Sequence, residues 1–410
     1  MGNEPPTNRR WRVLALLAVA ELFGMSLWFT ASAVSPQLST LWGLDAQQVG
    51  WLTAAVQLGF VVGTAVAAVL NLADIFPSRA YFATAAVLGA GANAALLAAP
   101  GYEAALVLRF LTGFLLAGVY PPAMKMIATW FRSSRGLAIG TIVGALTVGK
   151  AAPYLVRAFA GATPQHVILT ASGAALIAAL LVGIGYREGP FPFARRPFSW
   201  DLAGAVMRDR PTRLAMGGYF GHMWELYAMW TFAAVFFFEF FVLRGYVEEQ
   251  ALRYSGMVGF AVIAVGALGC VLAGVWADRL GRERITIWAM AVSGTCALLI
   301  GWLLHAPFIL VLTVALIWGF AVVADSAQFS AVITEVAPSH AVGTALTLQT
   351  SLGFLLTIVT IQGVPLLREA VGWPAAFGVL ALGPAAGIVA MRRLNSLRIS
   401  STSVAAKTHS

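Results

Sequence analysis

The sequence predicts an all-α polytopic membrane protein with twelve transmembrane helices. Hydrophobic residues make up 60% of the 410 positions and charged residues only 10%, so the chain has too little charge to cover the surface of a soluble protein of this length. Apolar runs recur along the whole chain, and many reach the roughly 20 residues that a helix needs to cross the hydrocarbon core. Polar or turn-forming residues separate the runs.

Taken in order, the apolar runs form two sets of six on either side of one long break. The candidate spans are 12–35, 46–70, 80–100, 103–130, 136–158 and 165–186, then 212–243, 254–276, 285–305, 307–333, 341–365 and 372–391. The break at 187–211 is rich in proline and arginine and predicts a linker between an N-terminal bundle (1–186) and a C-terminal bundle (212–393), with a tail at 394–410. Within it, Phe198, Leu202 and Val206 share one helical face, which fits either a helix on the membrane surface or a solvated linker.

The net charge of +9 does not indicate a nucleic-acid-binding protein, because the cations form short clusters between apolar runs. Of the 26 lysines and arginines, 19 fall on the side of the N-terminus. Four lie near loops on the other side and three within spans. This bias predicts that both termini are cytoplasmic. Cys270 and Cys296 both fall within spans and predict packing roles rather than a disulfide.

An internal repeat relates the two sets of spans. Asp74, in LNLADIFPSR after the second span, and Asp278, in GVWADRLGRER after the eighth, stand 204 residues apart. Gly50 and Gly63 have the same spacing as Gly256 and Gly269, at an offset of 206. A duplicated six-helix unit explains both offsets, and parallel repeats of this kind are typical of secondary transporters.

The second of these loops resembles the signature of the major facilitator superfamily, G-x-x-x-D-R-x-G-R-[KR]. The matching residues are Gly274, Asp278, Arg279, Gly281 and Arg282. The first copy keeps Asp74 and Arg79 but has Leu70 and Pro77 in place of glycines. The resemblance implies two pseudo-symmetric six-helix bundles and a conformational latch formed by these loops. The alternative for the three arginines Arg279, Arg282 and Arg284 is that they only set the topology.

Charges within the spans predict the functional site, since a charge at the bilayer centre is tolerated mainly where it faces the bundle interior or a water-filled cavity. In the first span, Glu21 shares a helical face with Trp28, so we expect a coupling acid beside a ring that contacts substrate. In the fourth, Arg109 matches an arginine that the resembled family carries in many proton-coupled members, and we expect it to hold an acid or an anionic substrate. In the fifth, Lys150 lies too deep to reach either surface, and it is predicted to line the cavity or to pair with an internal acid.

The seventh span combines ionisable and aromatic residues. His222 and Glu225, at i and i+3, are spaced to form a hydrogen-bonded pair that exchanges a proton, and Glu225 is the first choice for proton coupling. Trp224 and Tyr227 belong to a second stripe, which fits contact with a planar ligand or ordinary helix packing. Asp325 is a further candidate for proton coupling, and Gln328 and Gln349 for substrate binding, although hydrogen bonds between helices explain all three nearly as well.

These patterns favour a secondary transporter that moves a small anionic or planar aromatic metabolite, with a proton as co-substrate. We expect a monomer in the cytoplasmic membrane of a bacterium, with no cofactor, no metal and no nucleic-acid partner. The alternative is a proton-driven exporter of lipophilic compounds. Exporters of the resembled family carry a glycine–proline pair in the fifth span, and Lys150 follows Gly149 here, which counts against that alternative. A membrane receptor on the same fold is a remote alternative, and an enzyme is not expected because the loops carry no nucleotide, metal or nucleophile motif.

Overall fold

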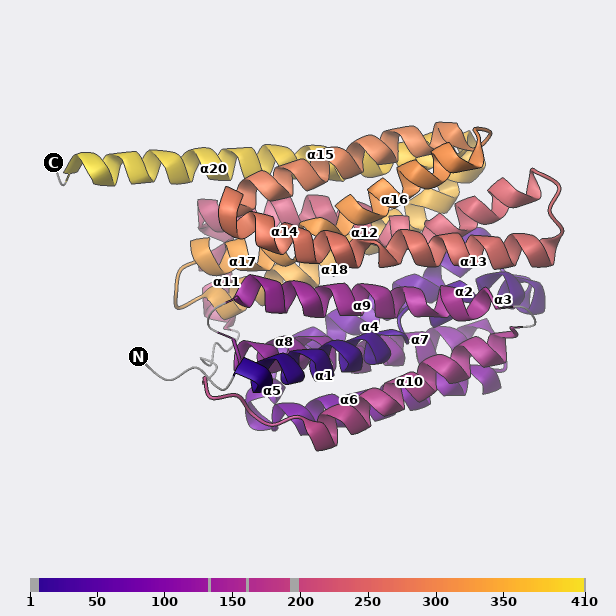
Figure 1. Ribbon diagram of the computed structural model, residues 1–410, viewed down its shortest axis with the longest axis horizontal. Coiled ribbons are helices and arrows are strands. Elements are labelled where there is room, and N and C mark those ends of the chain that lie inside the picture. Colours follow the sequence, from indigo (N-terminus) through magenta and orange to yellow (C-terminus); the bar gives the residue numbers. More distant parts are fainter. Residues whose placement is uncertain (1–6, 132–133, 160–161, 192–198, 409–410) are drawn as a thin grey trace.

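The computed structural model is a bundle of helices that run roughly along one axis, with the two halves of the chain side by side (Figure 1). It describes residues 7–131, 134–159, 162–191 and 199–408, apart from the side chains at 7, 73, 74, 135 and 400–408. The first half contains α1 (Thr7–Met25), α2 (Thr30–Ala33), α3 (Ser35–Trp42), α4 (Ala46–Val69), α5 (Leu72–Ile75), α6 (Ser78–Ala94), α7 (Tyr102–Leu116), α8 (Tyr120–Ala128), α9 (Arg135–Arg157) and α10 (Pro164–Gly185).

The second half follows the linker helix α11 (Trp200–Arg208). It contains α12 (Arg210–Val242), α13 (Glu248–Ala264), α14 (Gly266–Leu280), α15 (Arg282–Ile300), α16 (Phe308–Ala324), α17 (Ser326–Val336), α18 (Val342–Val371), α19 (Trp373–Gly378) and α20 (Leu382–Thr408). Helix α20 continues beyond the rest of the bundle, through most of the segment predicted as a tail (Figure 1).

Helix ends form where the sequence supplies capping groups. Asp45 Oδ1 accepts a hydrogen bond from Gln48 N at 2.8 Å and Gln48 Oε1 accepts one from Asp45 N at 2.9 Å, which starts α4 with a capping box. Thr163 starts α10 in the same way, with Pro164 as the first helical residue. Gly281, at φ +92°, ends α14 in a conformation that favours glycine.

Eleven helical stretches in the described part of the chain are long and apolar enough to cross a membrane. The twelfth predicted span, 12–35, is not one continuous helix: α1 stops at Met25, and α2 and α3 follow after short breaks. Helix α1 begins and α20 ends at the same end of the bundle (Figure 1), which requires an even number of crossings. The broken segment therefore supplies the remaining crossing, and the predicted class of all-α polytopic membrane protein is confirmed.

Two seams join the halves. In the first, α9 packs against α13 and α14 through small residues: a Cβ added at Gly140 would lie 3.1 Å from the Cys270 carbonyl oxygen, and one at Gly144 would lie 3.2 Å from that of Ala267. In the second, α4 packs against α18, where a Cβ at Gly50 would lie 3.2 Å from Gln362 Nε2. Glycines let the helix axes approach closely, so both seams are tightly packed.

The linker helix α11 lies against the second half rather than apart from it. Val206 is completely buried, and Ser199 N donates to Thr344 Oγ1 at 3.1 Å, which fixes the start of α11 on α18. Leu202 also packs against the hydrophobic core, whereas Phe198 lies outside the described residues. The face predicted for a membrane surface is thus partly used for packing.

Candidate functional site

A small cavity lies between the halves, near the middle of the bundle. Its volume is about 60 Å³, and its walls come from α4, α8 and α9 of the first half and from α12, α17 and α18 of the second. Lys150 lines it from α9, Trp28 from the break after α1, and Tyr227 from α12. These three residues were predicted to contact substrate, and the structure brings them together at this cavity.

The Lys150 ammonium group is enclosed by aromatic rings. Its Nζ lies 4.0 Å from the ring centroid of Trp28 and 5.4 Å from that of Trp230, and it donates a hydrogen bond of 2.5 Å to the Tyr227 hydroxyl. Lysine can be stabilised in such an environment because the faces of aromatic rings attract cations. Only 3% of Lys150 is exposed, so the charge acts in a poorly solvated space, where its attraction for an anion is strong.

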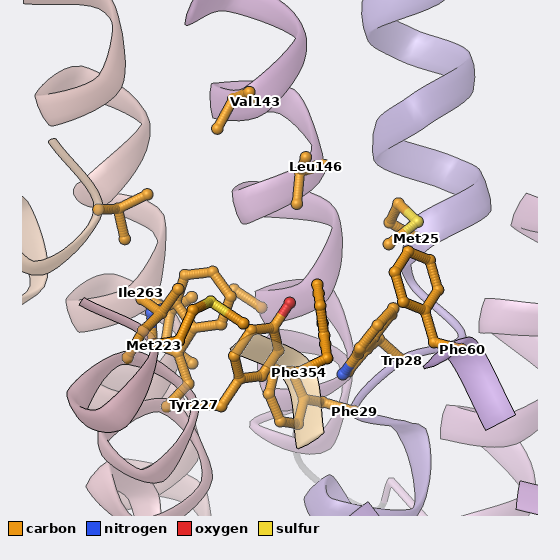
Figure 2. Packing of buried hydrophobic residues seen from close by; sticks show 14 of the residues in the cluster. Met25, Trp28, Phe29, Phe60, Val143, Leu146, Met223, Tyr227, Ile263 and Phe354 are labelled. Atoms are coloured by element: carbon orange, nitrogen blue, oxygen red, sulfur yellow. The ribbon is translucent and has the colours of Figure 1, made fainter. Parts of the chain in front are cut away.

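The rings of Trp28, Phe60, Tyr227 and Phe354 form one continuous cluster (Figure 2). The Phe60 and Phe354 centroids are 4.7 Å apart, and Phe354 lies 5.8 Å from Trp28 and 5.2 Å from Tyr227. Phe60, Phe354 and Trp230 line the cavity without having been named as site residues. Trp230 shares the predicted aromatic stripe of the seventh span. Phe60 and Phe354 lie in apolar helices, and the sequence does not distinguish a phenylalanine that lines a cavity from one that packs between helices.

Glu21 lies near Lys150, although the described residues contain no ion pair between the two. Helices α1 and α9 touch at Gly149, where an added Cβ would lie 2.2 Å from the Leu22 carbonyl oxygen, and the adjacent residues Glu21 and Lys150 interact electrostatically. Glu21 is fully buried, and within the described part of the chain neither of its carboxylate oxygens has a hydrogen-bond partner. A buried acid with free oxygens beside a cation is chemically suited to gain and lose a proton.

Arg109 occupies a different place from the one predicted. Its guanidinium donates to the carbonyl oxygen of Leu27 at 3.1 and 3.2 Å, to that of Trp28, and to Asn93 Oδ1 at 3.0 Å. The break between α1 and α2 leaves these carbonyls without their helical partners, and Arg109 satisfies them. It does not line the central cavity, and its contacts in this structure join segments of the first half, so its part in substrate binding stays a prediction.

The acids of the second half also have partners other than those expected. Glu225 accepts 2.7 Å hydrogen bonds from Ser293 Oγ and Trp318 Nε1, and His222 pairs with Asp325 instead, with Nδ1 2.8 Å from Oδ1. The predicted His222–Glu225 pair is therefore wrong, because long-range partners compete successfully with a neighbour one turn away. His222, Glu225 and Asp325 are all buried within the second half and do not line the cavity.

Three further candidates for substrate binding also lie away from the cavity. Trp224 Nε1 donates to the Val379 carbonyl at 3.0 Å, which turns its ring toward α20, and Gln328 Oε1 accepts from Arg282 at 2.7 Å. Gln349 is completely buried, and its amide has no hydrogen-bond partner among the described residues. The predictions for these three residues are not supported by their positions.

Among the predicted latch residues that the structure describes, Asp278 and Gly274 face the other half of the protein. The Asp278 carboxylate lies at the start of α9, where a Cβ added at Gly136 would be 3.0 Å from Oδ2, so this acid faces the N-terminal end of a helix from the other half. Gly274 lies opposite the same turn, with an added Cβ 3.3 Å from the Gly136 carbonyl oxygen. This arrangement places Asp278 and Gly274 on the seam between the halves.

By contrast, Arg282 and Glu283 of the signature loop form ion pairs with other residues of the second half. Arg282 Nε lies 2.7 Å from Glu335 Oε1, and Arg398 Nη1 lies 2.5 Å from Glu283 Oε1, which links α15, α17 and α20 within the second half. Arg79 and Arg279 are exposed. The Asp74 side chain lies outside the described part of the structure.

A larger cavity of about 250 Å³ adjoins the central one. It lies between the last turns of α4, where Ala67 and Ala68 line it, and the first turns of α18, where Leu346 lines it. Thr350 lines both cavities. Because α4 ends and α18 begins at the end of the bundle where α1 starts, the larger cavity lies toward that end.

Comparisons with known proteins agree with this architecture. A family model described as Major Facilitator Superfamily matches residues 16–361. Over 132 residues the chain is 31% identical to the 4-hydroxybenzoate transporter PcaK of Pseudomonas putida, a match that spans 31% of this chain and 28% of that protein.

Two solved structures share the fold. The human organic anion transporter MFSD10 (TETRAN) aligns with a TM-score of 0.70 at 16% identity, covering 94% of this chain and 100% of that one. The proton:xylose symporter XylE bound to 6-bromo-6-deoxy-D-glucose aligns with a TM-score of 0.72 at 14% identity, covering 94% and 95%. With the family model covering most of its length, the chain belongs to the Major Facilitator Superfamily: it is a multi-pass secondary transporter and not an enzyme.

Proposed function

We propose that this transporter moves a small aromatic carboxylate and that a proton accompanies the anion. The observation that carries the proposal is the Lys150 ammonium group, buried among the rings of Trp28, Tyr227 and Trp230 in a cavity between the halves. An ammonium ion offers a point charge to a carboxylate, and the surrounding rings offer flat apolar faces to an aromatic ring. The partial similarity to a 4-hydroxybenzoate transporter supports the same substrate class.

Glu21 is the residue that we propose for proton coupling. In the empty carrier, its carboxylate interacts electrostatically with Lys150. When a substrate carboxylate binds Lys150, two negative charges share one buried cation, and protonation of Glu21 relieves the repulsion. Anion and proton therefore move in the same direction. His222, Glu225 and Asp325 are less suited to this role because their partners lie within the second half, away from Lys150, whereas Glu21 interacts with Lys150.

Export of lipophilic compounds remains the alternative function, and the site gives it little support. A buried cation at the cavity wall attracts anions and disfavours the cationic compounds that such exporters commonly handle. Loss of resistance on deleting the gene, in a host that lacks other exporters, would favour the alternative.

A binding experiment with matched ligands tests the proposal. We expect the purified protein to bind 4-hydroxybenzoate, but to bind its uncharged methyl ester and cyclohexanecarboxylate much more weakly. Lys150→Gln should weaken 4-hydroxybenzoate binding by about 30-fold or more, since truncating one partner of a buried charge pair costs at least about 2 kcal/mol. Lys125→Gln is the control: Lys125 does not line the cavity, and its replacement should leave the preference for the anion unchanged. Equal affinity of the wild type for acid and ester would contradict the proposal.

A further inference from the structure

Tyr227 holds the position that a bound aromatic acid would be expected to take. Its ring centroid lies 5.2 Å from that of Phe354, 5.3 Å from that of Trp230 and 5.7 Å from that of Trp28. Its hydroxyl oxygen accepts the hydrogen bond from Lys150 Nζ. A phenol ring thus lies within an aromatic enclosure with its oxygen on the buried cation, and the enclosure belongs to the protein itself.

The space left beside Tyr227 is too small for a second ring. The central cavity measures about 60 Å³. An apolar cavity that binds benzene in another protein measures about 150 Å³, and a site of the present size accommodates only a few water molecules. An aromatic substrate therefore cannot share the enclosure with the Tyr227 side chain in this conformation, and the ring must move when substrate enters.

We propose that Tyr227 is an internal stand-in for the substrate, a role that rests on the function proposed above. In the empty carrier its ring fills the enclosure and its hydroxyl satisfies Lys150; in the loaded carrier the substrate's ring and carboxylate replace them. In this proposal the bond persists while the empty carrier changes conformation. A buried ammonium group without an acceptor is costly, so an empty carrier lacking this hydroxyl would change conformation less readily. The enclosure that Tyr227 vacates also sets the substrate's size at a single ring.

The position of the bond strengthens this inference. Lys150 belongs to α9 in the first half and Tyr227 to α12 in the second, so their hydrogen bond spans the halves at the cavity. A substrate that replaces Tyr227 at Lys150 breaks this link and supplies its own contacts to both halves. Substrate binding and the inter-half link are therefore mutually exclusive, and the carrier has two alternative ways of holding its halves together at the cavity.

Tyr227→Phe tests the proposal, because it keeps the ring and removes the hydroxyl. Substrate then has no hydroxyl to displace from Lys150, so we expect 4-hydroxybenzoate to bind about tenfold more tightly, the value of a hydrogen bond to a charged group. Exchange of labelled for unlabelled substrate should continue at the wild-type rate. Net uptake into liposomes should slow by about tenfold, because only net uptake requires the empty carrier to return with Lys150 lacking its acceptor.

Two further variants keep the test decisive. Tyr154→Phe also removes a buried hydroxyl, one helical turn from Lys150 on α9, but Tyr154 does not line the cavity, so binding, exchange and net uptake should stay unchanged. In the Lys150→Met background, Tyr227→Phe should have no further effect on net uptake, since no buried ammonium remains.

The outcomes separate this inference from the proposed function. Weaker binding in Tyr227→Phe, or equal slowing of exchange and net uptake, would overturn the stand-in role while leaving the aromatic carboxylate substrate in place. A wild-type protein that fails to bind 4-hydroxybenzoate in preference to its methyl ester would overturn the proposed function itself, whatever Tyr227→Phe does.

Discussion

Replacing Arg109 with methionine should destabilise the protein far more than it alters substrate selectivity. Methionine has a similar length and flexibility but cannot donate a hydrogen bond. The substitution removes the Arg109 donors from three buried acceptors: the carbonyl oxygens of Leu27 and Trp28 and the side-chain oxygen of Asn93. The Leu27 oxygen keeps the hydrogen bond that Thr30 Oγ1 donates at 3.1 Å. The two carbonyls lie at the break of the first span, where the helix does not satisfy them.

The size of the effect follows from these acceptors. A buried polar group left without a partner costs about 1–3 kcal/mol in soluble proteins, and hydrogen bonds between membrane helices average about 0.6 kcal/mol. Taking about 1 kcal/mol for each of the two acceptors left without any donor, Trp28 O and Asn93 Oδ1, gives a loss of about 2 kcal/mol in the free energy of unfolding. Arg109→Lys should lose less, because one ammonium group satisfies some of the acceptors but not all of them.

Thermal unfolding of the purified protein in detergent, combined with 4-hydroxybenzoate binding, provides the assay. Arg109→Met should lower the apparent melting temperature clearly and leave the preference for the acid over its methyl ester unchanged. Lys150→Met makes the same replacement at the other buried cation, and it should abolish that preference with a smaller effect on unfolding. If Arg109→Met unfolded like the wild type and lost its preference for the anion, the structural role of Arg109 would be refuted and a substrate contact favoured.

Two other sets of variants test the remaining assignments. Glu21→Gln should abolish accumulation driven by a pH gradient in liposomes while preserving substrate exchange. Glu225→Gln should retain accumulation, because Glu225 bonds to Ser293 and Trp318 within the second half rather than acting on Lys150; the reverse result would move the coupling site to α12. Gly149→Ala should lower the melting temperature, since its Cβ would lie 2.2 Å from the Leu22 carbonyl oxygen and would force α1 away from α9. Gly173→Ala, with no heavy atom within 4 Å of the added Cβ, is the matched control; equal stability of the two alanine variants would disprove the tight contact at Gly149.

Much of the architecture could be predicted from the sequence because it depends on properties that extend along the chain. Apolar runs of sufficient length must form helices in lipid, since the hydrocarbon core offers no other partner for backbone groups. The glycines that recur every four residues from Gly136 to Gly144 predict close helix packing, and they lie at the seam with α14. Lys150 was predicted to line the cavity because its side chain is too deep to reach either surface.

Individual hydrogen-bond partners could not be predicted because they come from distant parts of the chain. Helical spacing pairs His222 with Glu225, but Asp325 is 103 residues away from His222 in sequence and lies closer in space. No proline marks the break after Met25 in the sequence. Arg109, which bonds to the Leu27 carbonyl oxygen at this break, comes from another helix. In a helix surrounded by apolar neighbours, sequence shows which residues are polar but not which face points toward the cavity.

The distribution of polar contacts bears directly on how the two halves move. Arg109 holds α1 against α7 within the first half, and Glu225 and Asp325 hold α12 against α15, α16 and the start of α17 within the second. Across the halves, by contrast, the central contacts are aromatic rings, glycine-lined helix faces and the Lys150–Tyr227 hydrogen bond. Buried hydrogen bonds are costly to break, whereas apolar surfaces slide with little change in energy. Each half should therefore move as a rigid unit, and the energetic control of that movement falls on Lys150, where the partner of the ammonium group changes when substrate binds.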